Sequence, residues 1–347
     1  PGVPAFRHRA VDFRRRLKTP ELSSNTLILG ATGGFGSAVA QELLRRGRPS
    51  RCLVRNLQKA STLLGKDSSL ELVQGDVQDQ NFVVRAAEGC GAIIHAINYP
   101  YPKWVPNMAR ATANVIAAAR AANATILFPG NVYGLGEQFS GPLDESAHNQ
   151  PTGHKGELRV TLEDSLLHAA EEEGSVRVIV LRAGDYFGPT VRNGLVDPIF
   201  GNAVDGKPLR ALGNLDAAHQ WAFVPDLARA ALDLLAIQEG LEAYEVFNFA
   251  GYIASPEREF LEQIAEQSGH AGLSIRVLPW SALKLAAMFD ATVRELMELR
   301  YLFDQSVILE GSKLRRTLPE FEETAIAEAI RVTLESYQND PSRSDSD

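Results

Sequence analysis

Cysteine is scarce in this chain of 347 residues, which contains two cysteines and seven histidines. Two thiols, Cys52 and Cys90, are too few for a disulfide framework, and they fall at the second predicted strand and near the fourth. We therefore expect both as small buried side chains in a reducing, cytoplasmic protein. The histidines show no metal-ligand spacing, so the sequence predicts no metal site.

Long apolar runs and an excess of basic charge are also lacking. No run approaches the length of a membrane-spanning helix, and no apolar signal segment precedes the first predicted strand. The net charge is −8 with both signs mixed, which favours neither nucleic acid nor a membrane surface as partner. A small molecule is the expected ligand. Residues 1–24 are predicted to be a flexible basic tail, and residues 338–347 a disordered tail.

Glycine, in contrast, is concentrated in one stretch. The apolar run Leu27–Leu29 leads into Gly30-Ala-Thr-Gly-Gly-Phe-Gly36, and small residues typical of a helix follow. Such a strand, loop and helix cradle a diphosphate, because glycines allow a tight turn and bring backbone N–H groups close to the anion. A surface turn is the alternative, but a second strand follows at the spacing of a βαβ unit. The loop residues predicted to bind a dinucleotide are Gly30, Thr32, Gly33, Gly34, Phe35 and Gly36.

Alternating apolar runs and helical patterns continue through the chain, which predicts an α/β fold with a doubly wound parallel sheet. The predicted strands are 51–54, 70–77, 92–97, 125–128, 176–181 and 244–249, and the predicted helices include 109–122 and those that begin near residues 155 and 225. The segment from the end of the strand at 176–181 to about residue 221 is predicted to be irregular. Beyond residue 255 a mostly helical segment is expected.

Two residues at predicted strand ends bear on the cofactor. Arg55 follows the second strand, where an acidic residue would bind a ribose 2′-hydroxyl and an arginine can pair with a 2′-phosphate. The sequence therefore favours NADP, with NAD as the alternative. Asp76 lies at the end of the third strand and is predicted either to face adenine or to cap a helix. His95 lies inside an apolar run and is predicted to be a hydrogen-bonded core residue.

Five motifs in order resemble the extended short-chain dehydrogenase/reductase family, in its NAD-dependent epimerase/dehydratase group. They are the glycine loop, Gly75-Asp-Val77, Val132-Tyr-Gly134, Leu181-Arg-Ala-Gly184 with Gly188-Pro189, and Trp221-Ala-Phe-Val-Pro-Asp-Leu-Ala228. The resemblance implies a Rossmann part (25–185 and 223–250) carrying a smaller interleaved C-terminal substrate lobe (186–222 and 251–337). It also implies that Asp76 and Val77 flank adenine, Ala96 approaches the ribose, and Ala183 and Gly184 approach the nicotinamide.

The family's catalytic pattern is not kept. Pro129 stands where the family has Ser or Thr, and the best register places Lys155 and Arg159 at the Tyr and Lys positions. We therefore hypothesise that Lys155 exchanges the proton, since Arg159 cannot act as an acid or base near neutral pH. Alternatively Lys155, Arg159 and Glu163 form a solvated helix face, or Arg159 binds the cofactor. Further proton-donor candidates are Tyr133, Tyr186 and His154, and His219-Gln-Trp221 is a candidate lining of the lobe.

The predicted function is an NAD(P)-dependent oxidoreductase, epimerase or dehydratase-like enzyme. Its substrate would be a small hydroxylated or carbonyl compound, with a nucleotide sugar as one candidate. A catalytically silent NADP-binding sensor or scaffold is the alternative, and a hydride-independent lyase or isomerase is a third. The resemblance and the alanine-rich helix at 109–122 also predict a homodimer that packs through this helix and the one near Lys155.

Overall fold

The computed structural model describes residues 25–65, 67–138, 140–172, 176–270 and 272–340. The predicted basic tail at 1–24, and residues 341–347 of the predicted C-terminal tail, lie outside the described residues.

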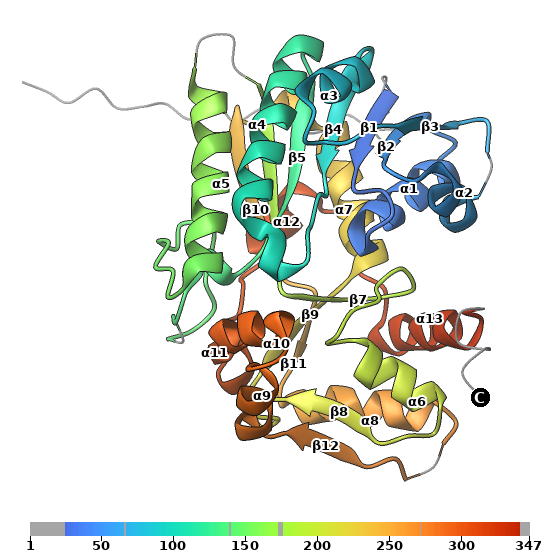
Figure 1. The fold of residues 1–347 in the computed structure, drawn as a ribbon, viewed down its shortest axis with the longest axis vertical. Coiled ribbons are helices and arrows are strands. Elements are labelled where there is room, and N and C mark those ends of the chain that lie inside the picture. The colour runs from blue at the N-terminus through green and yellow to red at the C-terminus, as the bar shows by residue number, and fades with distance from the viewer. Residues whose placement is uncertain (1–24, 66, 139, 173–175, 271, 341–347) are drawn as a thin grey trace, which may run out of the picture.

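A seven-stranded parallel sheet forms the larger, upper part of the molecule (Figure 1). Its strand order is β10-β6-β5-β4-β1-β2-β3, which reverses direction at β1 as a doubly wound sheet does. The strands are β1 (Asn25–Leu29), β2 (Ser50–Val54), β3 (Leu70–Gln74), β4 (Cys90–His95), β5 (Thr125–Gly130), β6 (Val178–Ala183) and β10 (Tyr244–Phe249). The predicted Rossmann-type α/β fold is therefore confirmed.

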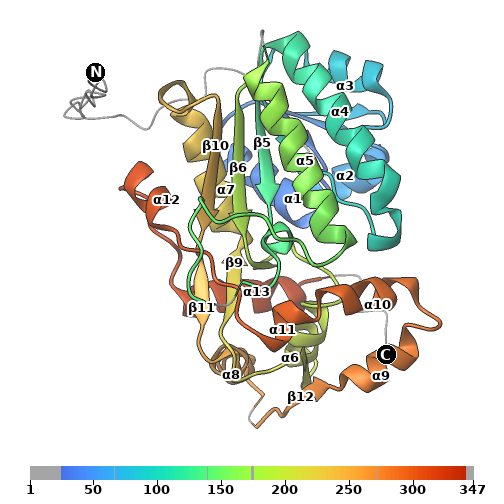
Figure 2. The same cartoon turned by 90° about the vertical axis from the view of Figure 1, so that its left-hand side faces the viewer.

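Helices cover both faces of this sheet (Figures 1 and 2). Leu27 and Leu29 pack in one buried cluster, and Ile28 between them packs in another on the opposite face. This alternation explains why a central strand such as β1 has an unbroken apolar run. The helices that follow β1 to β5 are α1 (Gly34–Arg45), α2 (Leu57–Leu64), α3 (Gln80–Ala87), α4 (Trp104–Ala122) and α5 (His154–Glu171). Helix α7 (Val224–Ala236) precedes β10 and packs against α1.

Smaller elements form a second part beneath the sheet (Figure 1). The chain passes directly from the end of β6 into β7 (Asp185–Phe187), which pairs with β9 (His219–Phe223). In turn β9 pairs with β11 (Tyr252–Ala254). The other elements of this part are α6 (Asn202–Val204), β8 (Leu209–Leu212), α8 (Glu257–Gln267), β12 (Ile275–Leu278), α9 (Trp280–Ala286), α10 (Ala291–Leu296), α11 (Tyr301–Asp304) and α13 (Ile326–Gln338), with short π or 3₁₀ turns at Asp197–Gly201 and Met297–Leu299. Helix α12 (Ser312–Thr317) packs against β10 of the large sheet, and 3₁₀ turns at Tyr101–Lys103, Tyr133–Leu135 and Gln238–Gly240 follow β4, β5 and α7.

One secondary-structure prediction was wrong in this second part, because the stretch predicted to be irregular contains β7, β8 and β9. The stretch predicted to be mostly helical is helical from α8 to α13, with the addition of β12. The cause is that β8 and β12 pair in parallel with each other, Leu209 opposite Ile275, across more than sixty residues of chain. Such short strands form because of a distant partner, and local sequence carries little trace of it.

Several local predictions hold. His95 is fully buried, and its Nε2 lies 2.9 Å from Thr112 Oγ1. Burial lowers the pKa of His95 to about 3, so the ring is a neutral core group. Both cysteines are free and buried. Among the described residues, no helix combines the length and apolarity that crossing a bilayer demands.

Candidate functional site

The glycine loop is closed by contacts that only glycine permits. Gly30 has φ +87°, and a Cβ there would lie 2.2 Å from the carbonyl oxygen of Ala96. A Cβ on Gly36 would lie 2.3 Å from the carbonyl oxygen of Gly30. Gly33 precedes α1 without any side-chain cap, so the first N–H groups of α1 remain available for an anion. The structure thus joins Gly30, Gly36 and Ala96 in one cradle at the carboxyl edge of the sheet.

Neighbouring strand ends place further predicted cofactor residues along the same edge. Arg55, directly after β2, is exposed and makes no ion pair within the described part of the chain. Asp76 is exposed too, and its carboxylate accepts from the backbone N–H of Gln78 at 2.9 Å. It is therefore not a helix cap, since Asp79 caps α3. Val77 is buried, and its carbonyl accepts from Asn114 Nδ2 at 2.7 Å.

On the other side of the cradle, Thr32 is exposed, whereas Phe35 is buried against the sheet. Gly34 is contacted from the second part of the molecule, because Thr190 Oγ1 donates to its carbonyl oxygen at 2.8 Å. Ala183 is buried, and a Cβ on Gly184 would lie 2.3 Å from the carbonyl oxygen of Gln220.

Helix α5 directs a row of charged side chains inward. Lys155, Arg159 and Glu163 are 3%, 7% and 6% exposed, so the alternative of a solvated helix face is wrong. Glu163 accepts from Arg182 Nη2 at 2.6 Å, and this ion pair is buried. Each charged side chain on this face forms an ion pair or a hydrogen bond with a partner from another element, as buried charges require.

Arg159 lies beneath the end of β5. Its Nη2 donates to the carbonyl oxygen of Pro129 at 2.5 Å, and its guanidinium carbon lies 4.5 Å from the centre of the Phe128 ring. Burial lowers the pKa of Arg159, and the charge of Glu163 opposes this shift. Its Nε is buried and finds no hydrogen-bond partner among the described residues. An arginine so placed has donor capacity left over for a ligand.

Lys155 makes contacts that its sequence position did not predict. Its Nζ pairs with Glu298 at 3.0 Å and with Glu295, and its backbone N–H donates to Glu298 Oε1 at 2.7 Å. Glu298 therefore caps the start of α5 from a segment about 140 residues away. To exchange a proton with a substrate, the Lys155 ammonium would first have to leave both carboxylates.

Two tyrosines lie next to Lys155. The hydroxyl groups of Tyr101 and Tyr133 are 3.0 Å apart, and the Lys155 Nζ lies 5.3 Å from the centre of the Tyr101 ring. Trp104 stacks on Tyr133 with ring centres 6.3 Å apart. Burial, followed by the neighbouring Tyr101 and then the charge of Asp185, raises the pKa of Tyr133 well above its ordinary value, and burial also raises the pKa of Tyr101. Both phenols therefore carry their protons near neutral pH.

The other proton-donor candidates differ in position. Burial raises the pKa of Tyr186 to about 12, and the nearby charge of Arg159 works against this shift. His154 is 92% exposed and lies 3.2 Å from Glu157, on the outer side of the helix start. The structure thus gathers Tyr133, Tyr186, Lys155 and Arg159, whereas the His154 side chain is in solvent.

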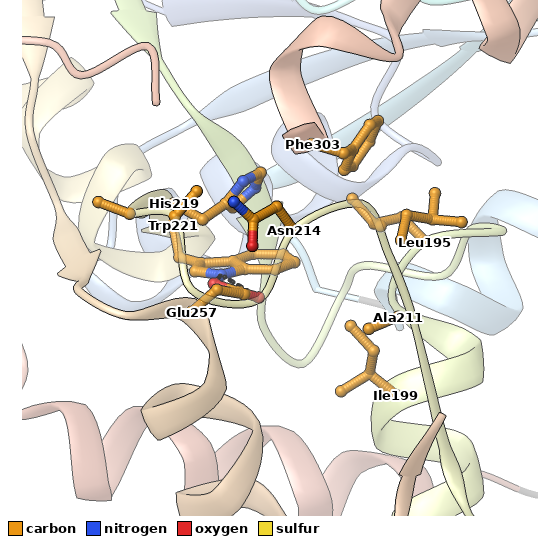
Figure 3. Close-up of a pocket in the computed structure, with 11 residues that line it drawn as sticks. Leu195, Ile199, Ala211, Asn214, His219, Trp221, Glu257 and Phe303 are labelled. Carbon is orange, nitrogen blue, oxygen red and sulfur yellow. Dashed lines mark hydrogen bonds between the residues drawn. The ribbon is translucent and has the colours of Figure 1, made fainter. Parts of the chain in front are cut away.

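An ion pair links β7 to β9 beside these tyrosines. His219 Nε2 lies 2.9 Å from Asp185 Oδ2, and the imidazole stacks on Phe303. Burial disfavours the charged imidazole, but the hydrogen bond to Asp185 and the charge of Glu257 outweigh it and raise the pKa of His219. In Figure 3, His219, Trp221 and Glu257 gather on one wall of a cavity of about 20 Å³, which holds about one water molecule.

A match to a family model identifies the protein family of this chain. The model of the NAD dependent epimerase/dehydratase family matches residues 26–250, which include the cradle, α5 and β9. The chain belongs to the NAD dependent epimerase/dehydratase family. This confirms the predicted family. The match ends at β10, so the family model does not cover the segment that carries Glu295 and Glu298.

Solved structures of similar fold align with nearly the whole chain. WbmH of Bordetella bronchiseptica, solved with NAD⁺, is 19% identical with a TM-score of 0.70, over 91% of this chain and 98% of that one. DesIV of Streptomyces venezuelae, a dTDP-glucose 4,6-dehydratase solved with NAD, is 18% identical with a TM-score of 0.73, over 92% and 98%. At such identities these similarities establish the fold.

Among curated relatives, the uncharacterized protein y4nG of Sinorhizobium fredii is 23% identical over 75% of this chain. The aligned stretch spans 64% of that relative's own length. Photosystem II assembly factor Ycf39 of Trieres chinensis is 38% identical over only 68 residues, which are 20% of this chain and 21% of that protein.

Sequence reasoning missed Tyr101, Asp185 and the two glutamates that hold Lys155. Tyr101 and Asp185 follow β4 and β6, so the rule that ligands bind beyond strand ends could have found them. Glu295 and Glu298 lie in the last third of the chain, beyond the family match, and no local signal connects them to Lys155.

Proposed function

We propose that the chain is an NAD(P)-dependent oxidoreductase of the epimerase/dehydratase type, which acts on a hydroxyl or carbonyl group of a small substrate. The observation that carries this proposal is the cradle of Gly30, Gly36 and Ala96, which a Cβ would fill, at the uncapped start of α1. A diphosphate fits such a cradle because it accepts from the free N–H groups. Within the substrate class, nucleotide sugars are supported by the DesIV likeness.

Each cofactor-binding residue has a proposed role along the edge of the sheet. The glycine loop would hold the diphosphate, Val77 and Asp76 would flank adenine, and Arg159 would use its unpartnered Nε on the nicotinamide ribose. Ala183 and Gly184 would back the nicotinamide. When bound, the nicotinamide supplies hydride exchange. Exposed Arg55 supports a preference for NADP over NAD, because a guanidinium can pair with a 2′-phosphate.

For the proton we propose Tyr133 in place of Lys155. Tyr133 carries a proton at neutral pH and its hydroxyl lies 3.0 Å from a second hydroxyl, that of Tyr101, which can replace the proton once it is given up. Lys155 in contrast is bonded to two carboxylates. Tyr133 would donate to the substrate oxygen as hydride reaches the adjacent carbon.

Three further proposals accompany this function, on the division of the chain, its oligomeric state and its location. The division into a Rossmann part and an interleaved lobe is supported by the direct passage from β6 into β7 and from β10 into β11. A homodimer through α4 and α5 is supported by the alanine-rich outer surface of α4, and a cytoplasmic location by the two free, buried thiols.

The test combines cofactor binding with a metabolite screen. We expect NADPH to bind more tightly than NADH by fluorescence, and Arg55→Asp to remove that preference. In a screen that follows nicotinamide absorbance, Tyr133→Phe should lower turnover about 100-fold or more with cofactor affinity unchanged. Binding without turnover of any compound would favour the silent sensor. No binding of either cofactor would contradict the proposal.

A further inference from the structure

A short segment from the second part of the molecule lies against the glycine loop. Residues 188–192, which we call the strap, follow β7 and reach the start of α1. Thr190 Oγ1 donates to the carbonyl oxygen of Gly34 at 2.8 Å, and a Cβ on Gly34 would lie 3.3 Å from Val191 Cγ2. The glycine at position 34 therefore makes room for the strap rather than for the backbone of the loop itself.

The carbonyl group that Thr190 contacts belongs to the same peptide group as the N–H of Phe35. A peptide group is planar, so a contact that fixes the carbonyl oxygen of Gly34 also fixes the direction of that N–H. The N–H of Ser37 donates to the carbonyl oxygen of Gly33 at 2.9 Å, which is the first helical hydrogen bond of α1. The N–H of Phe35 lies before this bond and has no acceptor within the helix. It is therefore one of the donors that an anion at the start of α1 would engage.

Two hydroxyl groups donate to the Gly34 carbonyl oxygen, and they differ in origin. Ser37 Oγ, at 3.3 Å, belongs to α1 itself and moves with it. Thr190 Oγ1, at 2.8 Å, comes from the second part of the molecule. The Thr190 hydroxyl therefore ties the first turn of α1 to a different part of the fold.

The strap is held on its other side by α13. Arg192 Nη2 donates to the carbonyl oxygen of Ser336 at 2.9 Å, and the guanidinium carbon lies 3.7 Å from the centre of the Tyr337 ring. Tyr337 Oη donates to the carbonyl oxygen of Val191 at 3.2 Å. The strap is thus bonded both to α13 and to α1, which lies above α13 in Figure 1. These contacts hold the Thr190 hydroxyl in place before a cofactor binds.

We propose that Thr190 is a positioning residue for the cofactor, because it holds the Gly34 carbonyl so that the N–H of Phe35 points at the cofactor diphosphate. This deepens the proposed function, on which it rests, by assigning a residue of the second part to the support of the diphosphate cradle. A donor that is already held in its binding direction loses less freedom when the ligand binds, so removal of the Thr190 hydroxyl should weaken cofactor binding.

The size of the effect follows from the loss of one neutral hydrogen bond, which corresponds to about a threefold to tenfold change in affinity. The change should come from faster dissociation, because differences in affinity between variants of one site arise mostly in the dissociation rate.

Stopped-flow and equilibrium measurements of NADPH and NADH test this proposal through the fluorescence of the bound nucleotide. Thr190→Val removes the hydroxyl and keeps the shape of the side chain, whereas Thr190→Ser keeps the hydroxyl. Thr62→Val is the control, because Thr62 Oγ1 also donates to a backbone carbonyl oxygen, that of Gln58 at 3.0 Å, on the exposed side of α2. Urea denaturation measures the stability of each variant. If Thr190→Val does not fold, Thr190→Ala takes its place with the same expected result.

For the cofactor that the wild type binds more tightly, we expect Thr190→Val to raise both the dissociation rate and Kd about threefold or more. Thr190→Ser and Thr62→Val should stay within about twofold of the wild type. A purely structural role would instead lower the free energy of unfolding and leave the dissociation rate unchanged.

A folded Thr190→Val variant that releases the cofactor at the wild-type rate would overturn the inference and leave the proposed function standing. So would a Thr190→Ser variant that releases the cofactor as fast as Thr190→Val does. Failure of the wild type to bind either cofactor would overturn the proposed function, and this inference with it.

Discussion

The contact between Lys155 and the C-terminal segment should behave as a structural tether. Replacing Lys155 by Met keeps the length and apolar stem of the side chain but removes both ion pairs with Glu295 and Glu298. It leaves two carboxylates without their cation at the start of α5. The segment from α10 to α11 then depends on a small apolar cluster that includes Leu299 and Leu302.

The magnitude follows from how exposed the partners are. Breaking a fully buried ion pair costs about 3–5 kcal/mol, whereas an exposed pair contributes about 0–1 kcal/mol. Lys155 is 4% exposed but its partners are 23% and 37% exposed, so solvent screens part of the interaction. We expect Lys155→Met to lower the free energy of unfolding by about 2 kcal/mol, with a coupling of about 1 kcal/mol to Glu298→Gln in a double-mutant cycle.

Urea denaturation measures both quantities, and hydrogen exchange locates the effect. Exchange should rise in residues 291–304 of Lys155→Met and stay unchanged in β1. Lys207→Met is a matched control, because the Lys207 side chain is 64% exposed and pairs with Asp205, so its loss should cost under about 1 kcal/mol. A coupling energy near zero, or unchanged exchange over 291–304, would refute the tether.

Three further predictions concern charge, pH and assembly. Glu163→Gln leaves the Arg182 guanidinium buried without its carboxylate and should cost about 3 kcal/mol in urea, while Glu157→Gln on the exposed side of α5 should change stability by less than about 0.5 kcal/mol. The pKa of His219 is raised on folding, so its stabilising contribution is complete below its ordinary pKa of about 6.5 and is lost as pH rises through the folded value. The free energy of unfolding of the wild type minus that of His219→Gln should therefore decline as pH rises. A difference that does not change with pH would contradict this prediction. Light scattering at micromolar concentration should give a dimer mass that Ala113→Arg on α4 reduces to the monomer, and a monomeric wild type would rule out the proposed interface.

The sheet could be predicted from sequence because its central strands, such as β1 and β4, are buried on both faces. Leu27, Ile28 and Leu29 read as one apolar run, and the glycine loop after them admits few other conformations. The strands β8 and β12 could not be predicted, since each is four residues long and exists by pairing with the other.

For the candidate site, the division is similar. The cradle residues are close in sequence or at strand ends, so the motif places them. The role of Lys155 depends on Glu295 and Glu298, about 140 residues away, and a helix pattern cannot distinguish a charge in solvent from one met by such a partner. That is why the solvated-face alternative stayed open until the fold was known.

Equilibrium binding of NADPH and NADH to the wild type and to Gly36→Ala tests the central claim most directly. A Cβ at Gly36 would lie 2.3 Å from the carbonyl oxygen of Gly30, whereas a Cβ at Gly240 would meet no atom within 4 Å, so Gly240→Ala is the control. We predict that the wild type and Gly240→Ala bind with equal affinity and that Gly36→Ala loses at least about tenfold. Equal binding by all three proteins, or by none of them, would contradict a dinucleotide site at the cradle.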